Sequence, residues 1–546
     1  MHHARAFFCS ATEPLNLAVF RLVVFSWLLR LIVHTDFVRF VQMPAGLRVP
    51  PPGLESFFDW IPLQASAVAA VQTLAIAACA AAVVGFMTRT SAVIACVCAT
   101  YLLGLPEIFG KIDHLSHHLI WFTAILAAAP SGDALSIDAL RAAWRRADRG
   151  DTAPPPPSVA DALPLRFVWL LIGVIYLFPG MWKLHAGIEW FASDNIKFLM
   201  YQFWSEKGFL PAFRIDRYPF LYRACGLGTV VFETSFFFCL FFPRLRLLAL
   251  AAGLLFHLLT EIYLRIFFLS LLLCYAAFVD WNWLCGRIGS LLYRCDLLLT
   301  YDSRDASDRR LVASLRLFDV FRRVRYVDST DAHLDTAAAA AGNIAVTIGA
   351  RTLTELRAAL AVAAYVPLIV PAYPLLLASA VRSRQSPVLS PAVAPETQAP
   401  PRSAAVIIVG TALLAANFYC GFTRTTSWPF SVYPQFASII RAPTRTSIEA
   451  IVQRGNGEAQ PVDIGLRPAA LEHFRQEQPA ARAARLDAMK SLLIANHLSL
   501  RPGEALEFYQ VTRSTVPEEH DRAPLRRELL WAFRPEPETA ALRSGE

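Results

Sequence analysis

Ionisable side chains inside apolar segments are the residues of this sequence best suited to chemistry. Lys183 closes one long apolar segment, and Glu233 and His257 lie within two others. Such groups are costly in a membrane, and where they occur they face a bundle interior or a wet cavity. A lysine desolvated there can lose its proton near neutral pH and act as a base or nucleophile. The sequence therefore predicts a polar site centred on Lys183.

Further polar residues lie near the ends of the same segments. His257 and Glu261 are one helical turn apart and are predicted to share a helix face. The remaining candidates flank Lys183 or open another apolar segment: Trp182, His185, His114, His117 and His118. Because His117 and His118 are adjacent, they point in different directions on a helix, and we expect no metal site.

Each candidate also has a structural interpretation. Lys183 at a helix end could snorkel to the lipid headgroups. His257 and Glu261 could be a polar pair that joins helices, and His117 and His118 could be interfacial residues. The basic residues 21 and 30 of the first apolar segment share this ambiguity.

The composition indicates whether water or lipid surrounds the helices that carry these residues. Of 546 residues, 55% are hydrophobic and 17% are charged, whereas soluble chains carry about 25% charged residues. The net charge of +8 lies mostly in short loops, so we expect no nucleic-acid partner. Ten cysteines without a CxxC spacing favour neither disulfides nor zinc. The expected partner is the lipid bilayer, and the chain is predicted to be an integral membrane protein.

A bilayer core needs about 20 mostly apolar residues per helix. The predicted spans are 15–35, 64–87, 91–107, 116–130, 163–183, 225–242, 245–263, 264–280 and 403–422, with one of the tightly joined 245–263 and 264–280 open to being tilted or re-entrant. Arginine-rich loops at 131–162, at 243–246 and after 280 place the N-terminus in the cytoplasm. The predicted fold class is thus mainly α, a polytopic transmembrane helical bundle of about 8–9 spans. Under this topology Lys183, His257, Glu261 and the histidines at 114–118 meet in the outer leaflet.

Several motifs within residues 10–290 resemble the HTTM membrane domain of vitamin K-dependent gamma-carboxylases and their bacterial relatives. They are Lys111-Ile112-Asp113-His114-Leu115-Ser116-His117-His118-Leu119, Gly132-Asp133-Ala134-Leu135-Ser136-Ile137-Asp138, Gly180-Met181-Trp182-Lys183-Leu184 with Trp190, and Phe256-His257. Their order along the chain also matches that of the family.

This resemblance implies a chemistry. In the family the lysine is the base that deprotonates a reduced quinone; reaction with oxygen then gives a strong base that removes a glutamate γ-proton, so that carbon dioxide can add. The resemblance implies a quinol-dependent carboxylase/epoxidase of the bacterial inner membrane, with a vitamin K hydroquinone-like cofactor and a protein or peptide substrate on the outer side. The alternative is a non-catalytic membrane scaffold or transport-like protein, in which the polar cluster stabilises helix packing or lines a solute path.

The resemblance also distributes roles among the candidate residues. The catalytic candidates are Lys183, His257, His117 and His118. The candidate contacts of the reduced quinone are His114, Glu261, Trp182 and His185. It does not choose among the three histidines at 114–118.

Residues 297–384 resemble the DCC-type thiol–disulfide oxidoreductases, a thioredoxin-like family. A strand is predicted at 297–302, a helix at 307–318 and a strand at 324–328. Asp305 and Asp308 stand where the family has its redox cysteines, so thiol–disulfide exchange by the family's route is not expected. We predict a degenerate, cytoplasmic domain of structural or interaction role. The apolar stretch 359–380 is predicted to be a domain helix or membrane-surface segment rather than a span.

The remaining chain is predicted to comprise a Pro-, Ala- and Ser-rich linker at 385–402, the span 403–422 and a small extracytoplasmic α+β module at 425–540. In that module, strands are predicted at 446–452, 461–464, 505–512 and 527–533, a hairpin turn at Asn456-Gly457 and a helix at 468–496.

Overall fold

The structure is a computed structural model, and helices make up most of it. It describes residues 7–50, 63–109, 114–329, 345–349, 351–353, 355–372, 403–431, 436–455, 457–464, 479–495, 498, 500–501, 503–519 and 522–534. The predicted linker 385–402, Asn456 and the first part of the predicted helix 468–496 lie outside these residues.

Six described helices are long and apolar enough to cross a bilayer. They are α2 (Pro14–His34), α5 (Ala65–Val84), α6 (Thr88–Gly104, extended by η2, Leu105–Ile108), α9 (Val159–His185), α13 (Pro243–Leu264) and α19 (Ser403–Thr423). The count is seven if the bent pair Leu269–Phe278 and Trp281–Leu292 forms one span. These helices confirm the mainly helical membrane fold, and the chain is an integral membrane protein.

Three predicted spans differ from the helices observed. The segment 116–130 forms α7 (His117–Ala128), which at 12 residues is about 18 Å long and too short to cross alone. The segment 225–242 belongs to α12, which begins earlier (Pro219–Cys239). The segment 264–280 is not one helix, because Arg265 adopts a left-handed conformation (φ 52°) that ends α13.

The chain after Arg265 continues as short, bent pieces. These are α14 (Leu269–Cys274), η4 (Tyr275–Phe278) and α15 (Trp281–Leu292), and an 84° bend separates Leu269–Phe278 from Trp281–Leu292.

The long helix α9 lies at the centre of the helical body and packs against α12, α19, α7 and α2. Of its apolar stretch 94% is buried, whereas for α13 the share is 17%. Thus α9 carries Lys183 into the interior, while most of α13 is left to face lipid. The short elements α10 (Glu189–Ala192), α11 (Asn195–Lys207) and η3 (Ile215–Arg217) follow α9.

Arg21, whose role the sequence leaves open, is a structural residue. Its buried guanidinium donates to the carbonyl oxygens of Ser131 and Leu135, each at 2.6 Å. A guanidinium has five N–H donors and can bind several carbonyls at once. Arg21 therefore fixes the loop that leads from α7 into α8 (Ile137–Ala147).

The first sheet contains β1 (Leu297–Tyr301), β2 (Val324–Asp328), β3 (Ala345–Ile348) and β4 (Arg351–Leu353) in the order β2-β1-β3-β4. Strands β1 and β2 are parallel, whereas β3 is antiparallel to both β1 and β4. The helices α16 (Ala306–Phe318) and α17 (Glu355–Tyr365), with η6 (Pro367–Ala372), complete this unit. Tyr365 and Ile369 pack into its core with Leu297, so the described part of 359–380 belongs to this unit and is not a span.

Asp305 and Asp308 both accept hydrogen bonds at the start of α16. Asp305 is the N-cap of α16 and accepts from the N–H of Ser307 at 2.6 Å. Asp308 accepts from the N–H of Asp302 at 3.0 Å. Both side chains thus stabilise the strand-to-helix turn.

The second sheet is antiparallel throughout. Its strands are β5 (Thr444–Gln453), β6 (Ala459–Val462), β7 (Ala505–Ser514) and β8 (Arg526–Phe533), in the order β6-β5-β7-β8. Helix α21 (Pro479–Ala495) packs its buried face on this sheet. The strands predicted for this part of the chain are therefore observed, with small shifts of their ends.

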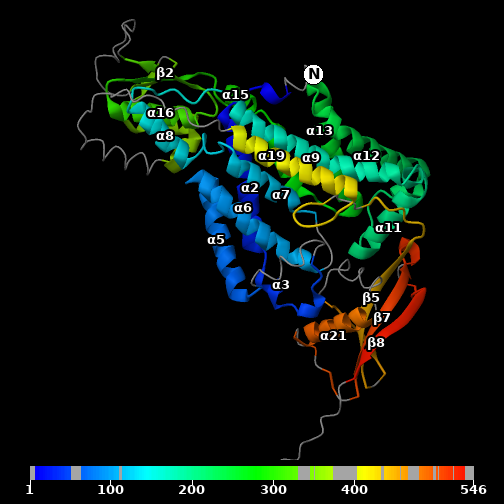
Figure 1. The fold of residues 1–546 in the computed structure, drawn as a ribbon. Helices are drawn as coiled ribbons and strands as arrows, with labels where there is room; N and C mark the ends of the chain where they lie inside the picture. Colours follow the sequence, from blue (N-terminus) through cyan, green and yellow to red (C-terminus); the bar gives the residue numbers. More distant parts are fainter. Residues whose placement is uncertain are drawn as a thin grey trace, which may run out of the picture.

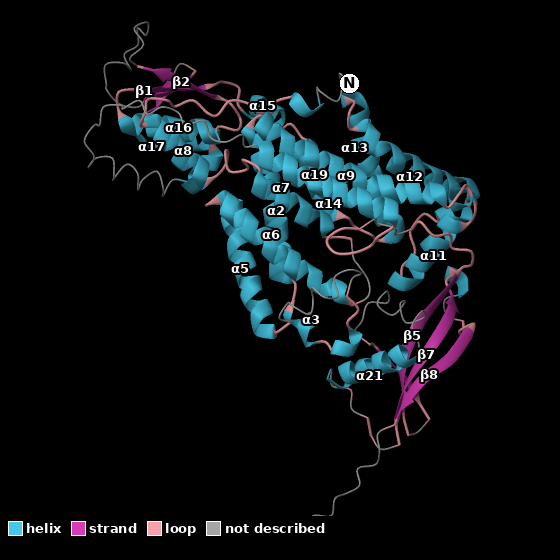
Figure 2. Cartoon of the chain, in the orientation of Figure 1, coloured by secondary structure: helices cyan, strands magenta, loops and turns pink. Residues whose placement is uncertain are grey.

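The two sheets lie at opposite ends of the helical body (Figures 1 and 2). Helix α8 packs on α16 of the first unit, and we call this end the β1–β4 side. Leu47 and Ile108 join the core of the second unit, and we call this end the β5–β8 side. Helix α8, in the loop predicted to be cytoplasmic, thus contacts the first unit. Leu47 and Ile108, in loops predicted to face outward, contact the second unit.

Candidate active site

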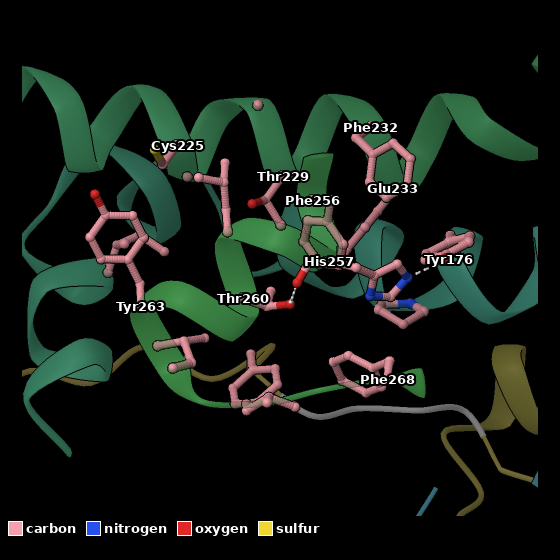
Figure 3. A pocket seen from close by; sticks show the side chains of 18 of the residues that line it. Tyr176, Cys225, Thr229, Phe232, Glu233, Phe256, His257, Thr260, Tyr263 and Phe268 are labelled. Atoms are coloured by element: carbon pink, nitrogen blue, oxygen red, sulfur yellow. Dashed lines mark hydrogen bonds between the residues drawn. The ribbon is translucent and has the colours of Figure 1, made fainter. Parts of the chain in front are cut away.

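A cavity of about 360 Å³ is enclosed by α9, α12, α13 and the broken segment after α13 (Figure 3). Its lining is mostly apolar and aromatic. Lys183, Glu233, His257, His118 and His114 also line it. The structure therefore brings together polar residues from four separate segments.

Lys183 and Glu233 form a buried ion pair at the centre of this site. Lys183 Nζ lies 2.6 Å from Glu233 Oε1 and 2.5 Å from Oε2, and the two side chains are 3% and 6% exposed. Gly180 permits this approach of α9 to α12, because an added Cβ would lie 2.8 Å from Glu233 Cβ and 2.9 Å from Thr234 N. Lys183 therefore points into the bundle and does not snorkel to the headgroups.

Trp190 connects this pair to the chain that follows α19. Its ring centroid lies 5.3 Å from Lys183 Nζ, within the range of a cation–π contact. Its indole N–H donates to Phe436 O at 2.6 Å. The neighbouring Asn195 accepts from Ile440 N at 2.8 Å and donates to Trp190 O at 2.9 Å.

We call residues 424–431 and 436–441 the strap. Phe436 of the strap lines the cavity. Two more indole N–H bonds tie the strap to the helices, from Trp121 to Pro429 O and from Trp428 to Thr100 O, each at 2.9 Å. The strap thus forms one wall of the site on the β5–β8 side.

His257 belongs to a chain of buried hydrogen bonds. Its Nε2 lies 2.6 Å from the Tyr176 hydroxyl, which lies 2.8 Å from the Tyr275 hydroxyl; the first contact is drawn in Figure 3. His257 Nδ1 is buried and has no hydrogen-bond partner among the described residues. One ring nitrogen is thus fixed by the protein, and the other is left for a ligand.

The three histidines at 114–118 divide between the cavity and its surroundings. His118 and His114 line the cavity, and within the described structure the buried His118 Nε2 has no hydrogen-bond partner. His117 packs against the strap, with its ring centroid 4.7 Å from that of Trp428. Adjacent residues on a helix differ by about 100° in direction, which explains the division.

The cavity opens between α12 and α13. Three of its lining residues are exposed there: Leu255 (56% exposed), Cys225 and Gly228. The residues around them are exposed and apolar, including Leu227 and Leu254. The side of the cavity at α12 and α13 is thus bordered by exposed apolar residues, as expected of a helix surface that faces lipid.

Three predicted quinol contacts lie outside the cavity lining. Glu261 lies one turn beyond His257 and pairs with Arg265 at 3.6 Å near the surface. Trp182 turns away from the site and donates to Gly421 O at 3.0 Å. His185 is exposed, and its ring lies edge-on to that of Trp182, with the two centroids 5.3 Å apart. Side chains next to Lys183 in the sequence leave the helix in other directions. Closeness in sequence therefore does not place Trp182 or His185 in the cavity.

Sequence reasoning names Glu233 only as an ionisable residue in a span, and it does not predict Tyr176 or Tyr275. A signal for Tyr176 is present in the spacing. Tyr176, Gly180 and Lys183 follow one another at intervals of four and three residues, which places all three on one face of α9.

A second ion pair stabilises the loop between α11 and α12, in which Ile215 lines the cavity. Arg214 Nη2 lies 2.8 Å from Asp216 Oδ2, and the Tyr201 hydroxyl donates to the same oxygen at 3.0 Å. Burial acts to raise the pKa of Asp216, but the hydrogen bonds from Arg214 and Tyr201 outweigh it and hold the pKa below its ordinary value. Asp216 therefore stays ionised and ties η3 to α11.

The described part of the chain holds no group of three or more His, Cys, Asp or Glu side chains placed to bind a metal ion.

Comparison of the chain with protein-family models, with curated proteins and with solved structures gave no match in any of the three.

Proposed function

We propose that the chain is a membrane enzyme of the HTTM type that takes a reduced, lipid-soluble quinone from the bilayer. Its site would remove a proton from the quinol hydroxyl as the first step of a carboxylase-like reaction. The observation that carries the proposal is the buried Lys183–Glu233 pair in an apolar cavity that opens among lipid-facing residues.

The cavity suits a quinol in size and in chemistry. Sites for such ligands are mostly apolar, with a few polar groups at fixed positions. Phe256 and Phe268 supply aromatic walls (Figure 3). His257 Nδ1 and His118 Nε2 are buried nitrogens that can bond to ring oxygens. When bound, a reduced quinone would supply the reaction with oxygen that provides the base for a glutamate γ-proton.

Lys183 and Glu233 accept the proton as one unit in this proposal. The pair has no net charge either as ammonium with carboxylate or as amine with carboxylic acid. One added proton gives it a charge of +1 in either form, and a charge in a site without water acts strongly on a bound group. Trp190 faces that charge with its ring. Lys183 can be the base only as an amine, so in this proposal its own proton first passes to Glu233, which becomes the carboxylic acid. The amine of Lys183 then takes the proton of the quinol, with Glu233 as its necessary partner.

The proposal includes an orientation and a finer fold. We place the N-terminus and the β1–β4 side in the cytoplasm and the β5–β8 side outside, with about nine spans if α7, α12 and the broken segment each count as one. The placement of the two sheets at opposite ends supports this, as do Arg141, Arg145 and Arg146 of α8 on the β1–β4 side. A four-stranded sheet in this order, with only β3 antiparallel, supports a thioredoxin-like origin for the first unit.

The test is quinol turnover by purified, full-length protein in lipid nanodiscs. The wild-type protein should consume a reduced naphthoquinone under oxygen and incorporate labelled carbon dioxide into a glutamate-containing peptide. Lys183→Ala is expected to abolish quinol consumption. Glu261→Gln also changes charge on the helix of His257 but outside the cavity, so this matched control should retain it.

The opening is tested separately with Gly228→Trp. An added Cβ at Gly228 meets nothing within 4 Å, so this change should block the opening without disturbing the fold. It should slow the reaction of a long-tailed quinol more than that of a quinol without a tail. Quinol binding without turnover would favour the scaffold or transport-like alternative, and a wild-type protein that neither binds nor oxidises a quinol would contradict the proposal.

A further inference from the structure

A second cavity, of about 440 Å³, lies on the β1–β4 side of the helical body. Its lining comes from the start of α6, the chain that follows α7, and helix α8. Three arginines line it: Arg89, Arg145 and Arg146. Its walls are far more polar than those of the first cavity, which points to a charged ligand rather than an apolar one.

The three arginines of this lining exceed its two acids, Asp133 and Asp138, by one charge. None of the three guanidinium groups forms an ion pair or hydrogen bond with a described residue, whereas the two acids in the same lining are engaged. Asp138 accepts from both the N–H and the hydroxyl of Thr88 at 2.7 Å, and Asp133 has a partner of its own. The cavity therefore has guanidinium donors in excess, and an anion is the ligand that would satisfy them.

Helix α8 holds two of these arginines in fixed positions. Its N-terminus is tied to α6 through Asp138. On its other side, the Trp144 indole donates to Ser314 Oγ at 2.8 Å, and Asp148 pairs with Arg310 at 2.7 Å. A site that is rigid before binding loses less entropy when the ligand arrives.

The surroundings of the cavity place it at the membrane boundary. It lies where α6 begins and α7 ends. The turn that leads into α6 exposes three large apolar side chains: Val84, Phe86 and Met87. Guanidinium groups next to exposed apolar residues match a phospholipid, whose phosphate and acyl chains meet at this depth.

We propose that the second cavity binds the phosphate of an anionic phospholipid from the leaflet on the β1–β4 side, through Arg89, Arg145 and Arg146. Arginine suits this ligand, because its planar fork donates two parallel hydrogen bonds to a phosphate group. The proposal does not depend on the chemistry of the first cavity, and failure of one leaves the other standing.

The test is lipid titration of the delipidated full-length protein, followed by native mass spectrometry. Phosphatidylglycerol should bind at least several-fold more tightly than phosphatidylcholine. Arg145→Gln/Arg146→Gln should weaken phosphatidylglycerol binding by about 10- to 30-fold, since each basic residue near a membrane surface contributes about one factor of five. The matched control is Arg141→Gln, on the same helix but stacked on Phe86 and outside the cavity; it removes one charge near the surface and no donor of the cavity, and should weaken binding by no more than about fivefold.

A titration with inorganic phosphate shows whether the bound phosphate group must belong to a lipid. If inorganic phosphate binds with the same dependence on the arginines while phosphatidylglycerol does not, the phosphate site stands but a lipid is not its ligand. Equal weakening in the control, or none in the double variant, would overturn the site. Arg145→Lys/Arg146→Lys covers the case in which the glutamine variant fails to fold: it keeps the charge but loses the fork, and an intermediate loss of affinity is expected.

Discussion

Substitution of Glu233 by glutamine tests whether the ion pair with Lys183 organises the site. The change keeps the size of the side chain but removes the negative charge that faces the ammonium group at 2.5 and 2.6 Å. Both side chains are almost fully buried. Removal of one partner from a buried ion pair costs about 3–5 kcal/mol, because the other charge is left without compensation. A loss of this kind lowers the melting temperature of a domain of about 150–250 residues by roughly 6–20 °C, and by less in the larger helical body of this chain.

The assay is thermal unfolding of purified variants in one detergent, followed by tryptophan fluorescence. Glu261→Gln is the matched control, because Glu261 forms a partly exposed pair with Arg265, and exposed pairs contribute about 0–1 kcal/mol. The double variant Lys183→Met/Glu233→Met should regain most of the loss, since a buried pair can be replaced by apolar side chains at little cost. The reasoning is refuted if Glu233→Gln melts with the control, or if the double variant loses the sum of its single variants.

Three further outcomes follow from the same contacts. Tyr176→Phe should lower the free energy of unfolding by about 1–3 kcal/mol, measured in the same assay, because His257 Nε2 loses its partner. The ion pair of Asp216 with Arg214 stabilises the fold at a pH above 3.8, the ordinary pKa of the Asp216 carboxyl group. This stability is lost as the pH falls through the lower pKa of Asp216 in the folded state. The difference in melting temperature between wild type and Asp216→Asn should therefore be constant down to about pH 4 and shrink below it. Trp190→Phe keeps an aromatic ring but removes the indole N–H that holds the strap, so trypsin should cleave the strap about fivefold faster or more, and unchanged cleavage would contradict the assigned role of that bond.

The membrane fold was predictable because each long helix contains an apolar stretch long enough to cross a bilayer. Lipid requires this of every spanning segment, so α9 and α19 are evident in the sequence without knowledge of their neighbours. The break after α13 was less predictable. Arg265 ends the helix through its own backbone conformation, and no proline or glycine marks the position.

The members of the site were predictable only in part. Lys183 and His257 stand out because charge inside an apolar segment is rare. That Lys183 meets Glu233, 50 residues away, depends on how α9 and α12 are rotated against each other, and this rotation is set by packing at Gly180. Glu261 shows the reverse case, because a shared helix face did not bring it into the cavity.

Hydrogen bonds at the strand-to-helix turn explain why Asp305 and Asp308 fit well at positions that a redox motif would give to cysteine. Asp305 accepts from the first N–H groups of α16 as its N-cap, and Asp308 accepts from the N–H of Asp302 before the helix. The sequence showed that the thiols were absent but not what the replacements contribute.

The hydrogen bond between Trp190 and the strap also determines how late in synthesis the site can be completed. The indole N–H of Trp190 donates to Phe436 O, and these two residues are 246 residues apart in the chain. At about 5–20 residues per second, a ribosome needs roughly 12–50 s to make that stretch. During this interval the central helices can already be inserted, while the cavity lacks the wall that the strap provides. We therefore expect the site to stay open on the β5–β8 side until the last span has entered the membrane, so that only the finished chain encloses Lys183.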